Sequence, residues 1–85
     1  MKRFHQGQLV HLADPVHIAA RFYRPELGGI MGAGGVIIPR QALDGPAYVF
    51  RVAEKCKCER ALIVFGSPES NQGMWLNVQD CIKGA

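Results

Sequence analysis

Gly29–Ile38 reads GIMGAGGVII, a cluster of glycines that runs directly into the apolar stretch Val36–Ile38. Glycine costs backbone entropy unless the chain needs a positive φ or a close approach between backbones. The four glycines of this stretch and the glycine before it therefore predict a hairpin or a bulged strand, and not a helix: Gly28, Gly29, Gly32, Gly34 and Gly35. The apolar residues after them predict a strand with large side chains on both faces.

The glycine cluster does not match a phosphate-binding loop. A dinucleotide fingerprint that starts at Gly32 has Ile37 where its last glycine belongs, and no Lys-Ser or Lys-Thr pair follows Gly34. Both motifs also need a helix next, whereas Val36–Pro39 reads as strand and stop. The cluster is interpreted as a structural turn.

The residues before the cluster indicate two extended segments. Residues 7–12, GQLVHL, alternate so that Val10 and Leu12 share a face. Residues 16–23, VHIAARFY, form a second alternating run, and Pro15 and Pro25 leave too little length for a stable isolated helix. We expect a strand or an irregular loop there.

The residues after the cluster predict further strands. Pro39–Gly45 has room for one helical turn, and Tyr48–Val52 alternates Tyr48, Phe50 and Val52 against Val49 and Arg51. A charged turn, EKCKCER, is expected over 54–60, a strand with two apolar faces over 61–65, and a loop over 66–73. MWLNV (74–78) is predicted to be the last strand, followed by a short turn over 79–82 and a polar tail.

This layout predicts an all-β domain of five or six short strands with a short helical turn. It resembles the SH3-like small antiparallel barrels in Gly7, Val10 and Leu12, in the Tyr-Val-Phe strand, and in Trp75-Leu76 leading into Asp80-Cys81-Ile82. The resemblance is architectural, and it implies a small barrel from Gly7 to Ile82.

Length and composition limit the protein class. The 85 residues, 48% hydrophobic with ten glycines and five prolines, predict a single domain over 1–85. The net charge of +3 and the pI near 9.0 are mildly basic, below the level typical of a dedicated nucleic-acid binder. No window is apolar enough to span a membrane, so no membrane partner is expected and a cytoplasmic protein is the default interpretation.

The cysteines and histidines do not form a recognisable site. Cys56, Cys58 and Cys81 are odd in number, which argues against a secreted disulfide framework, and a C-x-C pair is not the redox motif. His5, His11 and His17 lie six residues apart, a spacing of neither a helical ligand pair nor a zinc finger. We expect no metal and no cofactor.

No catalytic residue is predicted. Ser67 and Ser70 lie in a loop and not at a strand-to-helix elbow. The tail is similar to the plasmid-borne type II dihydrofolate reductases, tetrameric SH3-like barrels with a strand that carries a Val-Gln pair. Here Val78-Gln79 is followed by Asp80-Cys81 instead of Ile-Tyr, so no catalytic role is carried over.

Two predicted strands, 36–38 and 61–65, carry apolar side chains on both faces, so their outward side chains are expected to be covered. Apolar surface contributes about 25 cal/mol per Å² when it is covered, so either a second copy or the segment from Val16 to Leu27 is expected to cover it. The favoured hypothesis is a non-enzymatic, self-associating protein-binding module. Its expected binding surface comprises three aromatic residues, Phe22, Tyr23 and Trp75, and two arginines, Arg21 and Arg51.

Two alternatives stay open. One is a nucleic-acid-binding barrel that uses Arg21 and Arg51 with Lys55, Lys57 and Arg60. The other is an oligomeric ligand-binding or reductase-like barrel whose site lies at a symmetry axis, lined by Tyr48, Gln79 or Trp75 from several subunits.

Overall fold

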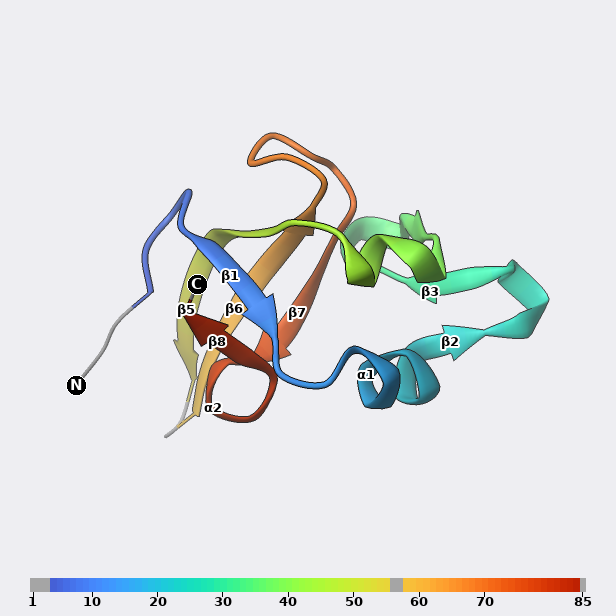
Figure 1. Cartoon of the computed structure of the whole chain (residues 1–85), viewed down its shortest axis with the longest axis horizontal. Helices are drawn as coiled ribbons and strands as arrows, with labels where there is room; N and C mark the ends of the chain where they lie inside the picture. Colours follow the sequence, from blue (N-terminus) through green and yellow to red (C-terminus); the bar gives the residue numbers. More distant parts are fainter. Residues whose placement is uncertain (1–3, 56–57, 85) are drawn as a thin grey trace.

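The strands form two antiparallel sheets in the computed structural model, which describes residues 4–55 and 58–84 (Figure 1). The larger sheet has the order β7-β6-β5-β1-β8, built from β1 (Leu9–Leu12), β5 (Ala47–Lys55), β6 (Cys58–Phe65), β7 (Gly73–Asn77) and β8 (Ile82–Gly84). The smaller sheet has the order β2-β3-β4, built from β2 (Tyr23–Arg24), β3 (Gly29–Met31) and β4 (Ile37–Ile38). The protein is thus mostly β and antiparallel.

Three parts of the fold prediction need correction. The described residues form eight short strands, and not five or six. The larger sheet is not closed into a barrel, because β7 and β8 are its two edges and the described pairings do not join them. The predicted polar tail is itself the edge strand β8, which pairs with β1 through Leu12 and Ile82.

The segment predicted as strand or loop over 16–23 is mainly a helix, α1 (Pro15–Phe22). The Asp14 carboxylate caps its start by accepting a hydrogen bond from the His17 backbone N–H at 3.1 Å, and Pro15 occupies the first turn, where its missing N–H costs nothing. Ile18 and Ala19 are buried in the core. Tertiary packing therefore stabilises a helix too short to persist alone.

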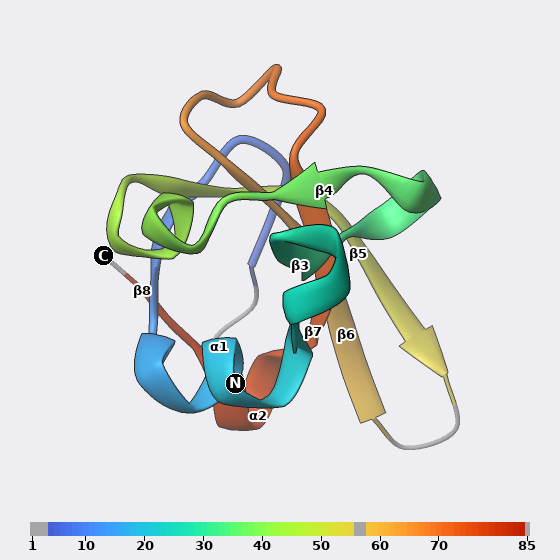
Figure 2. The same ribbon diagram turned by 90° about the vertical axis from the view of Figure 1, so that its right-hand side faces the viewer.

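The segment 23–38, here called the arm, contains the smaller sheet and the 3-10 helices η1 (Pro25–Leu27) and η2 (Ala33–Gly35). The predicted turn role of the glycines is confirmed: Gly28 ends η1 at φ 70°, a left-handed conformation that favours glycine. Ile30 and Ile38 pair across the sheet and are fully buried. The arm lies to the side of the larger sheet in Figure 1, so β3 and β4 stand in front of that sheet in Figure 2, which views the molecule from the arm's side.

Gly32 fixes where the arm meets the larger sheet. A Cβ at this position would lie 2.6 Å from the Gly73 backbone oxygen on β7 and 2.8 Å from Ile38 Cδ1. Only glycine permits this approach without movement of one backbone. The arm is therefore held against β7, the edge of the larger sheet.

The hairpin β5–β6 contains a β-bulge. Val49 pairs with Ile63 and Arg51 pairs with Leu62, so Phe50 is an extra residue on β5. Strict alternation predicted Phe50 and Arg51 on opposite faces, and this prediction is wrong. Val49 is 1% exposed, whereas both Phe50 and Arg51 are exposed.

One core lies between the inner face of the larger sheet and the elements that cover it. It includes buried side chains from the sheet strands, α1, the arm and the helix η3 (Arg40–Asp44), among them Val10, Ile18, Ile30, Leu43, Val49, Ile63, Phe65, Met74 and Leu76. The helical turn predicted over 39–45 is confirmed by η3, which is followed by Gly45 as its C-cap.

The C-terminal helix α2 (Val78–Cys81) joins β7 to β8. Asn77 caps it, since its side-chain oxygen accepts a hydrogen bond from the Gln79 N–H at 3.0 Å. Val78 is buried and Gln79 is exposed. The Val-Gln pair thus lies on a helical turn and not on a strand, which removes its similarity to the reductase strand.

Candidate binding surface

The outer face of the larger sheet carries a shallow apolar groove of about 180 Å³. We call it the outer-face groove and define it by its seven lining residues: Phe50, Leu62, Val64 and Gly73 on the sheet, Ala33 on η2, and Ser70 and Asn71 on the loop 66–72. Three segments far apart in the sequence thus meet at one site.

The bulge on β5 determines what faces the outer-face groove. An extra residue in one strand bends it and lets two successive side chains emerge on the same side. Phe50 lines the groove and is 39% exposed, and Arg51 stands directly opposite Leu62 in the register. The bulge therefore exposes an aromatic and an arginine residue in succession on β5, and side chains of these two types dominate binding surfaces.

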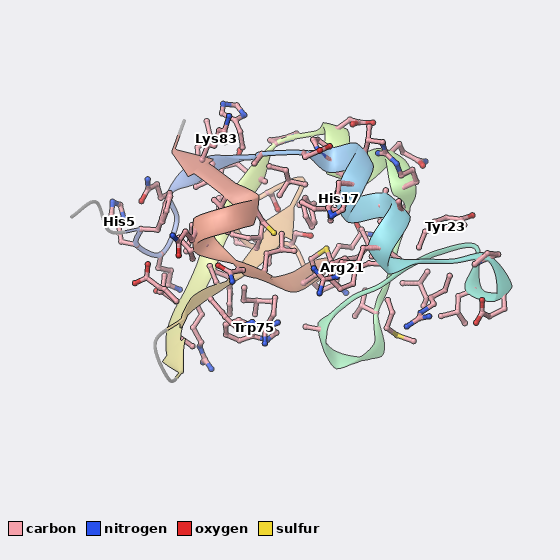
Figure 3. The ribbon with its side chains drawn as sticks, turned by 90° about the horizontal axis from the view of Figure 1, so that it is seen from below. His5, His17, Arg21, Tyr23, Trp75 and Lys83 are labelled. Carbon is pink, nitrogen blue, oxygen red and sulfur yellow. The ribbon has the colours of Figure 1, made fainter. Side chains whose placement is uncertain are left out.

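Two cross-strand rows extend the groove along the sheet. In the first row, Arg51 on β5 pairs with Leu62 on β6, which pairs with Trp75 on β7. Trp75 is half-buried, and Figure 3 shows it on the opposite side of the molecule from Lys83 of β8. In the second row, Leu9, Tyr48, Val64 and Gly73 are successive partners across four strands. Directly opposite residues share a face, so both rows belong to the outer surface.

The walls of the groove are held in place by backbone contacts. Ala33 follows Gly32, whose position against Gly73 was described above. The loop 66–72 is fixed by hydrogen bonds donated by the Gln72 N–H to Ser70 Oγ at 3.0 Å and by the Phe65 N–H to the Gln72 oxygen at 3.0 Å. The groove is therefore present without a ligand, which lowers the entropy cost of binding.

The charge around the groove is uneven. Arg51 and Arg60 are both exposed, and Arg60 pairs with Ala53 and Asn77 on the outer face, two residues along β6 from Leu62. Among the side chains that the structure describes, the one ion pair joins Arg40 and Asp44 at 3.3 Å. Glu69, exposed in the loop 66–72, lies beside the groove residue Ser70 at the other end. On the outer face, the two arginines thus lie toward the β5–β6 hairpin, and the acidic Glu69 lies in the loop.

The five residues predicted for protein binding divide into two groups. Arg51 and Trp75 lie on the outer-face rows. Arg21, Phe22 and Tyr23 lie where α1 meets β2; the Arg21 guanidinium carbon sits 5.5 Å from the centre of the Phe22 ring, and Phe22 packs against the core. Phe50, Leu62 and Val64 were not predicted as site residues, although the two-sided apolar strand over 61–65 was a signal for Leu62 and Val64.

The structure places the predicted nucleic-acid residues on the β5–β6 hairpin only in part. Arg60 and Arg51 share the outer face, and Lys55 stands at the last register position of β5, opposite Cys58. Lys57 lies outside the described residues.

The expected cover for the outward apolar side chains comes partly from this chain. Val64 is buried and Leu62 is half-buried beside Ala33, Ser70 and Asn71. The segment Val16–Leu27, proposed as an alternative cover, contributes no lining residue. On the arm, Ile37 stays exposed.

The described residues were also compared with the requirements of a metal site and of a membrane-spanning helix. Over 4–55 and 58–84, no group of three or more His, Cys, Asp or Glu side chains has the geometry for a metal ion. Cys81 is a half-buried free thiol. None of the helices that the structure describes has the length and apolar character to cross a membrane.

Comparison with protein-family models, with curated proteins and with solved structures finds no match to this chain. The geometry of the outer face is therefore the basis for a functional proposal.

Proposed function

We propose that this protein is a non-enzymatic module that binds a protein segment in the outer-face groove. The observation that carries the proposal is the β5 bulge, which turns both Phe50 and Arg51 toward solvent beside an apolar cleft. A β-bulge commonly re-aims side chains at functional positions. Aromatic and arginine side chains next to an apolar pocket are the groups that dominate protein interfaces.

We also propose that the larger sheet has an SH3-like arrangement. Support comes from the strand order β7-β6-β5-β1-β8 and from the one-turn helix α2 between the last two strands. In an SH3-like interpretation, the arm is a long insertion between β1 and β5. Small barrels of this type bind partners on exposed sheet faces and loops.

The experiment is a selection from a displayed library of random peptides against the protein. Phe50→Ala removes a side chain that is 39% exposed, so it leaves the core intact, and Val16→Ala on exposed α1 is the matched control. We expect enriched peptides that bind the wild type and the control equally and bind Phe50→Ala at least about tenfold more weakly. Peptides that bind all three proteins equally, or no enrichment at all, would reject the proposal.

A second proposal concerns self-association through the arm. Met31 and Ile37 are cross-strand partners on the face opposite Ile30 and Ile38, and they are 46% and 37% exposed. Leu27 on η1 is 41% exposed. Two copies related by a two-fold axis would cover this apolar surface with the same surface of the partner.

Sedimentation velocity over a range of concentrations tests self-association. We expect a concentration-dependent dimer for the wild type and a monomer for Met31→Lys, because a charge at a face-to-face contact must lose its water. A wild type that stays monomeric at the highest concentration would exclude association through this surface.

A further inference from the structure

We propose that the ligand of the outer-face groove is an extended acidic peptide with one large apolar anchor, whose carboxylates lie at the second residue from that anchor. This inference rests on the proposed function and specifies the ligand. It follows from the size of the groove, from the charges at its ends and from the residue spacing along β6.

The size of the groove fits one apolar side chain. Its volume is about 180 Å³, and its sheet side is formed by Phe50, Leu62 and Val64. An engineered apolar cavity of about 150 Å³ in another protein accommodates benzene, so there is room here for one phenyl ring or one branched aliphatic group. Ser70 and Asn71 provide polar groups at the margin for the peptide backbone.

The charges on the outer face indicate which charge the ligand carries beside its anchor. Arg51 and Arg60 are exposed on the outer face, and the described ion pair Arg40–Asp44 involves neither. The positions described between them on the outer face, Leu62, Ala53 and Trp75, carry no charge. On the outer face at the hairpin end, a ligand carboxylate would therefore meet two cations, since Glu59 occupies the next register position on β6, which faces the other way, whereas Glu69 at the loop end repels carboxylates.

The spacing follows from strand geometry. Arg60 and Leu62 are two residues apart on β6, and residues at i and i+2 on a strand share a face at about 7 Å. A peptide in extended conformation has the same repeat. An anchor seated over Leu62 and Val64 thus presents its second neighbour to Arg60, on the side of the hairpin.

Single-stranded nucleic acid fits this surface less well. Such ligands need several backbone-tracking cations and exposed rings on which successive bases stack. The groove instead has mostly aliphatic walls, and Trp75 in the adjoining row is half-buried. The net charge of +3 is also modest.

The test is an NMR titration of ¹⁵N-labelled protein in 50 mM salt with four probes. Three probes are synthetic nine-residue peptides. The first has a central phenylalanine with glutamate two residues away on each side. The second has lysine in place of both glutamates, and the third has alanine in place of the phenylalanine. The fourth is a twelve-residue oligothymidine. We expect the glutamate–phenylalanine peptide to bind at least about tenfold more tightly than either other peptide and more tightly than the oligonucleotide.

Charge-reversal variants localise the effect. Arg51→Glu and Arg60→Glu are each expected to weaken the glutamate–phenylalanine peptide about three- to tenfold, and the loss should shrink at 500 mM salt. Arg24→Glu, an exposed arginine on the arm, is the matched control and should bind like the wild type. Unchanged binding by both groove variants would overturn the proposal.

The outcomes distinguish the proposed acidic ligand from the proposed peptide-binding function. Equal or tighter binding of the lysine peptide, or of the oligonucleotide, overturns the acidic ligand. If library peptides require Phe50 but lack acidic residues, the binding function stands and the ligand class is wrong. If no peptide requires Phe50, both proposals fail.

Discussion

Gly32→Ala tests whether the arm is held against the larger sheet by close backbone contact. Gly32 has φ −93°, which alanine adopts freely, so backbone strain contributes nothing. The added Cβ would lie 2.6 Å from the Gly73 oxygen and 3.0 Å from the Val36 oxygen, both rigid backbone atoms. Overpacking of this kind costs about 1–3 kcal/mol, and each kcal/mol lowers Tm by about 4–8 °C in a domain of this size.

Gly45→Ala is the matched control. Gly45 has φ −94°, and its Cβ would lie 3.6 Å from the Ala42 oxygen, an ordinary contact. This variant should be as stable as the wild type, or more stable by about 0.4–1 kcal/mol, because alanine restricts the unfolded chain. The comparison thus isolates the steric effect at Gly32.

Urea denaturation followed by Trp75 fluorescence measures both variants, since Trp75 is the single tryptophan and lies on β7 next to the arm contact. Gly32→Ala should also weaken peptide binding, because a displaced arm moves Ala33 away from the groove. A Gly32→Ala stability within about 0.3 kcal/mol of the wild type, or an equal loss in Gly45→Ala, would refute the docking argument.

Three further predictions concern stability, each measured by urea denaturation. Val49→Ala should cost about 2 kcal/mol because Val49 is buried, whereas Phe50→Ala should cost less than about 1 kcal/mol; the reverse order would contradict the assignment of Val49 to the core and Phe50 to the outer face. Asp14→Ala should cost about 1 kcal/mol through the lost helix cap, and Asp44→Ala, in an exposed ion pair, less than about 0.5 kcal/mol; equal costs would remove the cap's role. Ile38→Ala should cost about 2–5 kcal/mol as a fully buried arm residue, and a cost below about 1 kcal/mol would mean that the arm is not packed on the core.

The turns and the central hairpin were predictable from the sequence. Glycines at 28, 34 and 35 adopt positive φ, as the glycine cluster indicated, and the segments 48–52 and 61–65 are paired strands. The alternation of Val10 and Leu12 also placed β1 correctly. These features depend on local backbone preferences, which a single sequence reveals.

Helix α1 was missed because its apolar residues also satisfy a period of two. Asp14-Pro15 is a helix start signal, but an eight-residue helix is marginal by itself. Burial of Ile18 and Ala19 in the core, where α1 contacts β3 and η3, provides the missing stability. That contribution is non-local and leaves no mark in the segment itself.

The bulge and the groove were hidden for a similar reason. Nothing in Tyr48–Val52 indicates which residue leaves the register, because a bulge depends on the pairing with β6. Without the bulge, Phe50 was assigned to the face of Tyr48 and Val52, and Arg51 to the other. Phe50 and Arg51 were therefore not predicted to share a face, although Arg51 and Trp75 were both predicted to bind.

The most direct test of the binding surface is a methyl and amide NMR map of the protein with a peptide obtained from the library selection. Shift changes at saturation should concentrate on Leu62, Val64, Phe50 and the Trp75 indole, with the inward-facing Ile63 little affected. Changes confined to the arm residues Leu27 and Met31, or spread evenly over the molecule, would contradict binding in the outer-face groove.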